Sequence, residues 1–481
     1  MAACISATSS GIWFTRAWLA PDKVQIMSFA RFIAFSAALS ATSGAQAAPQ
    51  DLLPPVTQTA PAPTPAPASP AAGDQPPGVP TLAPAVEPLA VWTLGDARKL
   101  LSVIENIGKR GLIAADYEPA ALKAAIAAGE GEALSALASH LFITLATDLR
   151  DGRTPRGARG EYFVDDTDAE TLPLDIALNV ALESHDIDGA LARLEPKHPD
   201  YAALKAELAK TPAAATTRLA QIRANLDRWR WLPQDLGEKH VLANVPEYMV
   251  RVNTYGRNIA SYRVIVGKID TQTPMLSAAA TGIVVHPPWV LPQSIIRQEV
   301  GPLIAKNPAL AKARGYVWTG EGKNLAVVQK PGPTAALGQL KLDMPNPHAI
   351  FLHDTPNKTL FANNPRAYSH GCLRTDRAFE FGILLSLLQS GERLDDVDAR
   401  NRIADNLVNL IRAGATAKAP FKQSIPVHIV YFTMATGGLK AVQSFPDLYG
   451  RDAPVIASFA KPRAARTPPE LIALPTVTPA G

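Results

Sequence analysis

Apolar and polar residues recur with two different periods along the chain, and the change of period divides it into two parts. Between residues 92 and 236 apolar residues recur at helical spacing, most clearly in 94–107 and 132–149. Apolar side chains three or four residues apart are typical of helices that bury one face. A last helix is predicted from Thr216 to Trp231, because Leu232-Pro233 follows it and proline ends helices.

From His240 onward the chain instead shows short runs that alternate or are continuously apolar, separated by Gly, Pro and Asn. Runs of this kind, rich in Val, Ile and Tyr, predict strands. The predicted strands are 241–245, 248–252, 262–267, 281–285, 326–329, 339–342, 349–353 and 427–433. Two helices are predicted between strands, from Ser294 to Ala313 and from Arg377 to Leu388.

These patterns predict an α+β fold, with an all-helical scaffold domain over 92–238 and a mostly-β domain over 239–436. The 481 residues are enough for two domains, since a single hydrophobic core rarely grows past about 250–300 residues. Residues 437–481 end in a Pro- and Ala-rich stretch, so we expect a C-terminal tail that frays.

The N-terminal 47 residues have the layout of a secretory signal peptide whose natural start is Met27. After Met27 one basic residue, Arg31, precedes an apolar stretch from Phe32 to Ala41, and Ala45-Gln46-Ala47 offers a cleavage site. The alternative is an uncleaved membrane anchor, although the apolar stretch is shorter than the about 20 residues that span a bilayer. We therefore expect an exported protein with no stable membrane span after cleavage.

Residues 48–91 are a low-complexity tract of alternating Ala and Pro. This composition cannot bury a core and favours extended polyproline II, so the tract is predicted to be a linker. The whole chain has a formal charge of +4, which gives no reason to expect nucleic acid as a partner.

The chain has two cysteines, Cys4 and Cys372, and Cys4 lies in the expected signal peptide. The exported chain would then keep one cysteine, which cannot form an internal disulfide and is exposed to oxidation. A chemical role would explain why such a cysteine is kept, whereas a buried, inert cysteine is the plainer alternative.

The residues around Cys372 favour the chemical role. A free thiol is mostly protonated at neutral pH, so it needs a base, and His353 and His370 are both placed to lie near it. Gly371 lets the backbone turn tightly, so that consecutive N–H groups can stabilise a tetrahedral acyl intermediate. Arg374 offers a cation with bidentate donors for a carboxylate.

His353, fifteen further residues and then Ser369-His370-Gly371-Cys372-Leu373-Arg374 resemble the signature of the L,D-transpeptidase catalytic domain. Further blocks resemble the large, two-domain members of that family in the same order. They include 194–205, 226–233, 264–268, 286–292, 329–338 and 352–356.

This resemblance implies a β-sandwich catalytic domain with a helical lid, here at about 294–327, and no metal or cofactor. It implies Cys372 as nucleophile and His353 as general base, oriented by the backbone carbonyl of Asp354. The backbone N–H groups of His370, Gly371 and Cys372 would form the oxyanion site. Arg374 and Ser369 are expected to contact substrate.

The reaction implied by the resemblance is acyl transfer between peptidoglycan stem peptides in the periplasm of a Gram-negative envelope. A tetrapeptide stem would acylate the cysteine with loss of D-Ala, and the diaminopimelate amine of a second stem would accept the acyl group in a 3→3 cross-link. Carbapenems would acylate the same cysteine.

Three other interpretations remain open from the residues. The same acyl-enzyme could pass to water in a carboxypeptidase or endopeptidase, because the motif does not specify the acceptor. The chain could be a non-catalytic wall-binding protein, although the intact Cys372 and His353 argue against this. Zinc bound by His353, His370 and Cys372 is disfavoured, because the last two lie only two residues apart.

Overall fold

The computed structural model describes residues 90–165, 168–439 and 441–463. The expected signal peptide and nearly all of the expected linker lie outside the described residues. Within the described part, no helix combines the length and the apolar character needed to cross a bilayer.

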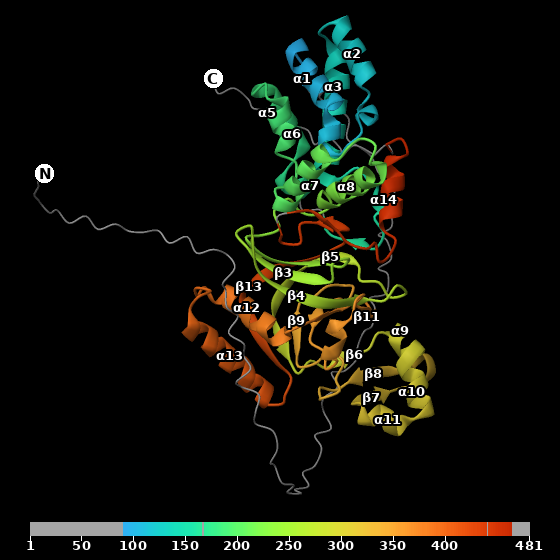
Figure 1. Cartoon of the computed structure of the whole chain (residues 1–481), viewed down its shortest axis with the longest axis vertical. Coiled ribbons are helices and arrows are strands. Elements are labelled where there is room, and N and C mark those ends of the chain that lie inside the picture. The colour runs from blue at the N-terminus through green and yellow to red at the C-terminus, as the bar shows by residue number, and fades with distance from the viewer. Residues whose placement is uncertain (1–89, 166–167, 440, 464–481) are drawn as a thin grey trace, which may run out of the picture. The chain divides into compact units, whose positions relative to one another are not determined.

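The first part of the described chain is helical (Figure 1, blue to green). Its α-helices are α1 (Leu94–Glu105), α2 (Pro119–Ala128), α3 (Glu132–Asp151), α4 (Asp168–Thr171), α5 (Leu174–Glu183), α6 (Ile187–Ala192), α7 (Pro199–Lys210) and α8 (Thr216–Trp229). The predicted helical periodicity is confirmed in α3, where Leu134, Leu141 and Leu145 lie on one buried face. Helix α8 ends two residues before the predicted Trp231.

The second part is built on one ten-stranded sheet, to which the first part contributes the short strand β1. Its strands are β1 (Tyr162–Phe163), β2 (Lys239–Asn244), β3 (Met249–Thr254), β4 (Arg257–Gly267), β5 (Met275–Val285), β9 (Leu340–Asp343), β10 (Leu352–His353), β11 (Ala367–Ser369), β12 (Leu373–Thr375) and β13 (Ala417–Val430). Neighbouring strands run in the order β5-β13-β2-β3-β4-β12-β10-β9, and β9 pairs with β5 again. The expected sandwich is therefore a sheet that closes on itself, and β13 joins strands β2 and β5.

Two helices on the sheet, α12 (Ala378–Ser390) and α13 (Val397–Arg412), contribute Phe381, Leu385 and Leu407 to its core. Figure 1 shows both helices beside β13. Helix α12 was predicted from the sequence, whereas α13 was not.

The expected lid corresponds to an insertion between β5 and β9, here called the insertion (291–329). It holds α9 (Gln293–Ile295), a π-helical turn (Ile296–Val300), α10 (Gly301–Lys306), α11 (Pro308–Ala313), β7 (Tyr316–Thr319) and β8 (Ala326–Gln329). With β6 (Trp289–Val290), strands β7 and β8 form a separate three-stranded sheet. A small core that includes Leu291, Ile296 and Val327 holds the insertion together.

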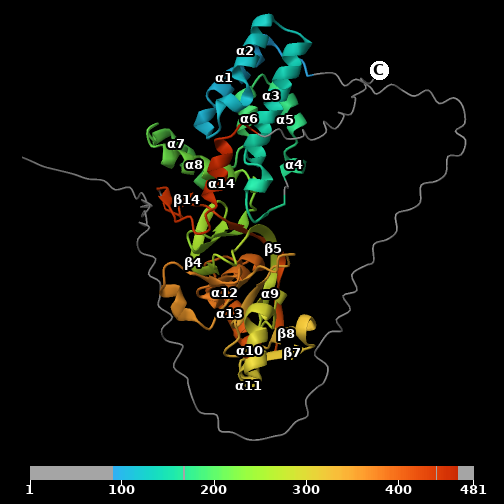
Figure 2. The same cartoon turned by 90° about the vertical axis from the view of Figure 1, so that its right-hand side faces the viewer.

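The expectation of a frayed C-terminal tail is wrong for residues 441–463, here called the C-terminal segment. Helix α14 (Asp452–Phe459) packs against α8, as Figure 2 also shows, and its Val455 is 1% exposed. The buried Arg228 of α8 binds Asp452 through Nη1 at 2.5 Å. The Pro- and Ala-rich composition that suggested fraying begins only after this helix.

The half-buried His198 and the buried His240 and His428 lie in a row where α7, β2 and β13 meet. The His198 ring stacks on Trp229 at 4.3 Å, and the His240 ring lies 6.5 Å from that of His198 and 6.1 Å from that of His428. Burial lowers the pKa of His198 and of His428 to about 4 and also lowers the pKa of His240. All three rings are therefore neutral in the folded protein at neutral pH.

We predict that the protein loses stability as pH falls from about 6.5 toward 4. In this window the histidines of the unfolded chain become protonated, whereas those of the folded protein stay neutral. The free energy of unfolding is therefore at its full value above about pH 6.5 and falls as the pH decreases, by a few kcal/mol in order of magnitude. Thermal unfolding followed by circular dichroism from pH 7.5 to 4.5 measures this loss. His428→Gln should flatten the dependence, whereas substitution of the exposed His140 should not. An unfolding temperature that stays constant over this range would contradict the prediction.

Candidate active site

Two short strands that run parallel bring the sequence-predicted residues together. Strand β10 ends at His353 and pairs with β12, with Leu352 opposite Leu373 and His353 opposite Arg374. Cys372 directly precedes β12, and the Leu373 N–H donates to the Phe351 carbonyl at 3.1 Å. Cys372 therefore lies level with Phe351, and it shares one face of the adjacent strands with His353, two positions away along them. Nineteen positions separate Cys372 and His353 in the sequence.

The loop that carries the cysteine, here called the nucleophile loop (369–373), is closed by a side chain of its own. The Ser369 hydroxyl donates to the Cys372 carbonyl at 2.5 Å and accepts from the Gly371 N–H at 3.2 Å. Gly371 has φ of +111°, a conformation that side chains with a Cβ rarely adopt. This is the tight turn that the glycine predicted.

The hydrogen bonds in this loop change two sequence-based expectations. Ser369 is 2% exposed and its hydroxyl is used inside the loop, so the structure does not place it where it would touch a substrate. The Gly371 N–H is also taken, by the Ser369 oxygen. In the described part of the chain, no hydrogen-bond partner is found for the N–H groups of His370 and Cys372, which leaves these two as candidate oxyanion donors.

The Cys372 side chain is half-buried, and its thiol donates to the Ala349 carbonyl at 3.5 Å. Within the described residues no hydrogen bond joins this thiol to the His353 ring. Burial raises the pKa of the Cys372 thiol to about 11, despite opposing effects of a backbone hydrogen bond at Phe351 and of two cations. The resting thiol is therefore protonated at neutral pH.

His353 is 6% exposed, and its Nδ1 lies 2.5 Å from the Asp354 carbonyl oxygen. A carbonyl can only accept, so Nδ1 carries the proton of the neutral ring and Nε2 is left as the acceptor. Burial, together with the nearby Arg374, lowers the pKa of His353 to about 4. The ring is therefore neutral at neutral pH, as a general base must be.

The Asp354 carboxylate fixes the backbone that carries this carbonyl. It accepts from the Gln339 N–H at 2.9 Å and pairs with Lys358. Gly338, with φ of +62°, leaves the space that this carboxylate occupies. The structure thus agrees with the expected position of Asp354 beside the imidazole.

Two cations act on the thiol, and only one was named from the sequence. Arg374 and Lys341 each lower the pKa of Cys372, and Cys372 in turn raises theirs against the larger effect of burial. Lys341 lies opposite His353 in the β9–β10 pair, and its Nζ is 4.4 Å from the centre of the Phe351 ring. Its position depends on strand register, which the alternation of Gln339-Leu-Lys-Leu alone does not give.

The His370 side chain contacts the insertion. Its Nε2 lies 2.7 Å from a carboxylate oxygen of Glu299, on the π-helical turn. The same carboxylate lies 3.8 Å from the Lys268 ammonium. Sequence reasoning missed Glu299, because no motif around it signals contact with a loop some seventy residues away.

Comparison with protein families gives two matches. The family model of the L,D-transpeptidase catalytic domain (YkuD) matches residues 238–381. The chain carries an L,D-transpeptidase catalytic domain. A scaffold domain model matches residues 89–208, so this L,D-transpeptidase domain follows a helical scaffold region, as the structure has it. The L,D-transpeptidase match ends inside α12, whereas the sheet continues to β13.

A Haemophilus influenzae protein provisionally named as an L,D-transpeptidase is 27% identical over 258 residues. The match covers 50% of each chain, so this chain spans about half the length of the curated relative. Solved structures also match, with low TM-scores, and the following two are among them. An L,D-transpeptidase from Mycobacterium smegmatis shares 11% identity over 40% of this chain and 58% of that chain, with a TM-score of 0.21. L,D-transpeptidase 1 of Mycobacterium tuberculosis shares 12% identity over 40% of this chain and 59% of that chain, with a TM-score of 0.19. At these TM-scores, neither structure supports a further conclusion.

We predict that Cys372 is alkylated slowly by iodoacetamide at pH 7 and that the rate rises about tenfold per pH unit up to pH 10. Its pKa of about 11 means that each unit increases the small thiolate fraction tenfold until the pKa is reached. Intact-mass kinetics of the full chain, in which Cys4 is replaced by Ser, would measure this. A rate that levels off near pH 8 would show that the thiol is far more acidic than its surroundings imply.

Lys341→Met should slow alkylation further at each pH, because a cation that stabilises the thiolate is removed. Lys341→Arg should preserve the rate. Lys312→Met in the insertion is the matched control, since Lys312 lies over Trp318. Equal rates for Lys341→Met and the control would exclude a role of Lys341 in thiolate formation.

Proposed function

We propose that this protein is a peptidoglycan L,D-transpeptidase that uses Cys372 as nucleophile and His353 as general base to form 3→3 cross-links between stem peptides. The reaction would take place in the periplasm, after export by the N-terminal signal peptide, and would serve cell-wall biogenesis and remodelling. The observation that carries the proposal is the parallel pairing of β10 with β12, which sets the buried neutral imidazole beside the nucleophile loop of an L,D-transpeptidase domain.

In the proposed first step the thiol turns from the Ala349 carbonyl toward His353 and gives its proton to Nε2. The sulfur then bonds to the carbonyl carbon of the diaminopimelate residue of a tetrapeptide stem. The bond to the terminal D-Ala breaks, and the His353 imidazolium returns the proton to the leaving amine. The product is a thioester on Cys372 and free D-Ala.

In the second step the side-chain amine of a second stem attacks the thioester. The neutral His353 takes a proton from this amine, the carbon–sulfur bond breaks, and the thiol is restored. An amide bond between two diaminopimelate residues results. Water in place of the amine would make the enzyme a carboxypeptidase or endopeptidase, and the same acyl-enzyme serves both reactions.

The electrostatics of the site support an acyl-transfer role that depends on substrate. At rest the high thiol pKa and the low imidazole pKa make proton transfer from Cys372 to His353 uphill. Arg374 and Lys341 stabilise the anion that forms. The N–H groups of His370 and Cys372, which have no partner among the described residues, are suited to the oxyanion of the tetrahedral intermediate.

The function is tested by incubating the purified full-length protein with sacculi rich in tetrapeptide stems and analysing muropeptides by mass spectrometry. We predict new dimers with a 3→3 bond and release of D-Ala, and neither with Cys372→Ala. Shortened stems without dimers would assign the hydrolase instead. If the sacculi do not change and no carbapenem adduct forms on Cys372, the protein would instead be a non-catalytic wall-binding protein.

A second prediction concerns the base. His353→Gln should lower the rate of carbapenem acylation at pH 7 by about 10²–10⁴, because general-base assistance is lost. The defect should shrink as pH rises toward the thiol pKa of about 11, where the thiolate forms without a base. Adduct formation followed by intact mass between pH 7 and 10 measures both effects. A defect that is constant across this range would instead indicate a structural role of His353.

A further inference from the structure

The turn between β4 and β5, here called the supporting turn (268–274), touches the nucleophile loop from the buried side. The Thr273 hydroxyl donates to the Gly371 carbonyl at 2.8 Å and accepts from the Gly267 N–H at 2.9 Å. Thr273 is fully buried. The Thr271 hydroxyl donates to the Ser369 carbonyl at 3.0 Å, and the Lys268 N–H binds the same oxygen at 3.0 Å.

These two carbonyls belong to the peptide groups that carry the candidate oxyanion donors. In a trans peptide, the carbonyl oxygen and the following N–H lie in one plane and point in opposite directions. When Thr273 holds the Gly371 carbonyl on the buried side, the Cys372 N–H must point the other way. Thr271 and Lys268 orient the His370 N–H in the same manner, through the Ser369 carbonyl.

The C-terminal segment supports this turn in a second layer. The Tyr449 hydroxyl donates to the Gly267 carbonyl at 2.7 Å and accepts from the Thr273 N–H at 3.2 Å. Arg451 donates to the Gln272 side chain at 2.7 Å and to the Thr273 carbonyl at 3.2 Å. Its guanidinium lies about 5 Å from the ring centres of Tyr431 and Tyr449, which restricts its movement.

We propose that Thr273, supported by Tyr449 and Arg451, is a positioning residue for acyl transfer. It holds the Gly371–Cys372 peptide group so that the Cys372 N–H faces the site of the tetrahedral intermediate. The inference rests on the proposed function, because only an acyl-transfer reaction at Cys372 needs an oxyanion donor there. The C-terminal segment, although remote in sequence from Cys372, thereby supports the residue that orients an oxyanion donor.

A purely structural role of this network is distinguished by comparing two reactions of the same sulfur. Acylation by a carbapenem passes through a tetrahedral oxyanion and needs the donor. Alkylation by iodoacetamide forms no oxyanion and needs only the thiolate. A positioning role predicts that acylation falls while alkylation does not, whereas a general disturbance of the loop lowers both.

The experiment uses the full chain with Cys4 replaced by Ser and measures both rates by intact mass, together with the thermal unfolding temperature. Thr273→Val should lower carbapenem acylation by at least about tenfold, toward the 10²–10³ typical of losing one donor, and leave alkylation within about twofold. Thr273→Ser keeps the hydroxyl and should restore acylation. Tyr449→Phe should reduce acylation by a smaller factor in the same selective way.

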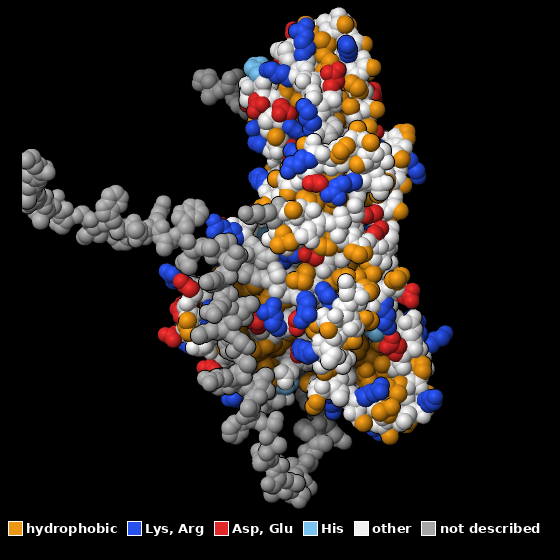
Figure 3. Space-filling view, viewed as in Figure 1, with side chains coloured by type: hydrophobic (Ala, Val, Ile, Leu, Met, Phe, Trp, Pro, Cys, Tyr) orange, Lys and Arg blue, Asp and Glu red, His pale blue; other side chains and the backbone are white. Residues whose placement is uncertain are grey.

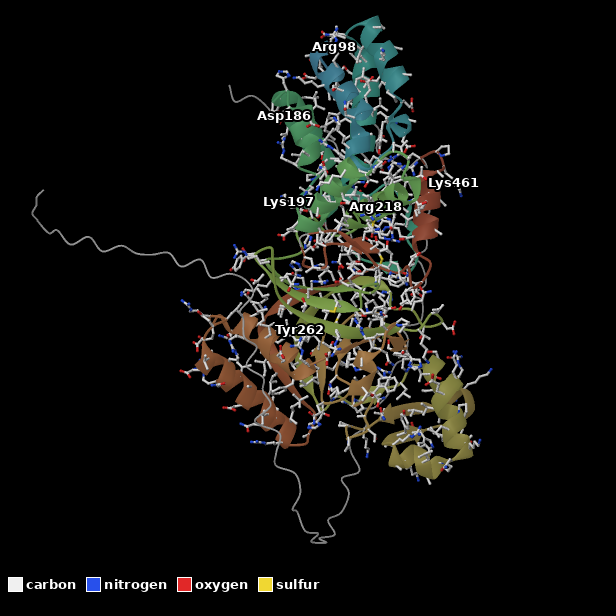
Figure 4. The ribbon with its side chains drawn as sticks, viewed as in Figure 1. Arg98, Asp186, Lys197, Arg218, Tyr262 and Lys461 are labelled. Carbon is white, nitrogen blue, oxygen red and sulfur yellow. The ribbon has the colours of Figure 1, made fainter. Side chains whose placement is uncertain are left out.

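Tyr262→Phe is the matched control, because this buried tyrosine of β4 (labelled in Figure 4) binds Glu380 and takes no part in the network. It should leave both rates unchanged. If Thr273→Val fails to fold, the selective loss in Tyr449→Phe decides. Equal losses of acylation and alkylation, or a folded Thr273→Val variant that acylates at the parent rate, would overturn the inference. A parent protein that forms no carbapenem adduct would overturn the proposed function, and the inference with it.

Discussion

The candidate site depends on hydrogen bonding between two strands of only two and three residues, β10 and β12. Strands this short contribute little stability alone, and their register comes from the neighbours that flank them. Strand β12 is held by β4, and β10 is held by β9, which also pairs with β5. A register shift of one residue would move His353 to the opposite face, so the closed sheet is what keeps base and nucleophile on one side.

Burial raises the free energy of the charged forms of the thiol and the imidazole, and the surrounding charges offset this only in part. The imidazole and the thiol both favour their neutral forms in a low-dielectric environment, since burial disfavours charge on either group. In the resting folded protein the thiol and the imidazole are therefore both uncharged, and the protonated thiol reacts slowly with electrophiles. On the face shown in Figure 3, Lys, Arg, Asp and Glu side chains are interspersed.

Much of this arrangement could be predicted from the sequence, because local patterns carry it. Helical spacing predicted α3, alternation predicted the main strands, and the requirement for a base and a tight turn pointed to His353 and Gly371. Long-range hydrogen bonding decided the rest. Lys341 reaches the site through strand register, and Glu299 through packing of the insertion on the loop. The inward role of the Ser369 hydroxyl depends on a backbone conformation that composition does not reveal.

The C-terminal segment shows how composition can mislead when it is averaged over a long stretch. Pro and Ala after residue 463 suggested a loose tail, yet Arg451 and Val455 are buried just before them. Polar residues inside a protein are retained when their hydrogen bonds are satisfied by specific partners, and these partners lie far away in the chain. Arg153, for example, donates to the backbone carbonyls of Ser458 and Lys461 and so ties α14 to the helical region.

Strand β13 has a further consequence for how the protein matures. It comes near the end of the described chain, yet it lies between β2 and β5, which are among the first strands to be synthesised. Until residues 417–430 have left the ribosome, the sheet that carries Cys372 has two open edges and cannot close. A chain that ends before residue 417 therefore carries Cys372 without the closed sheet that sets it beside His353.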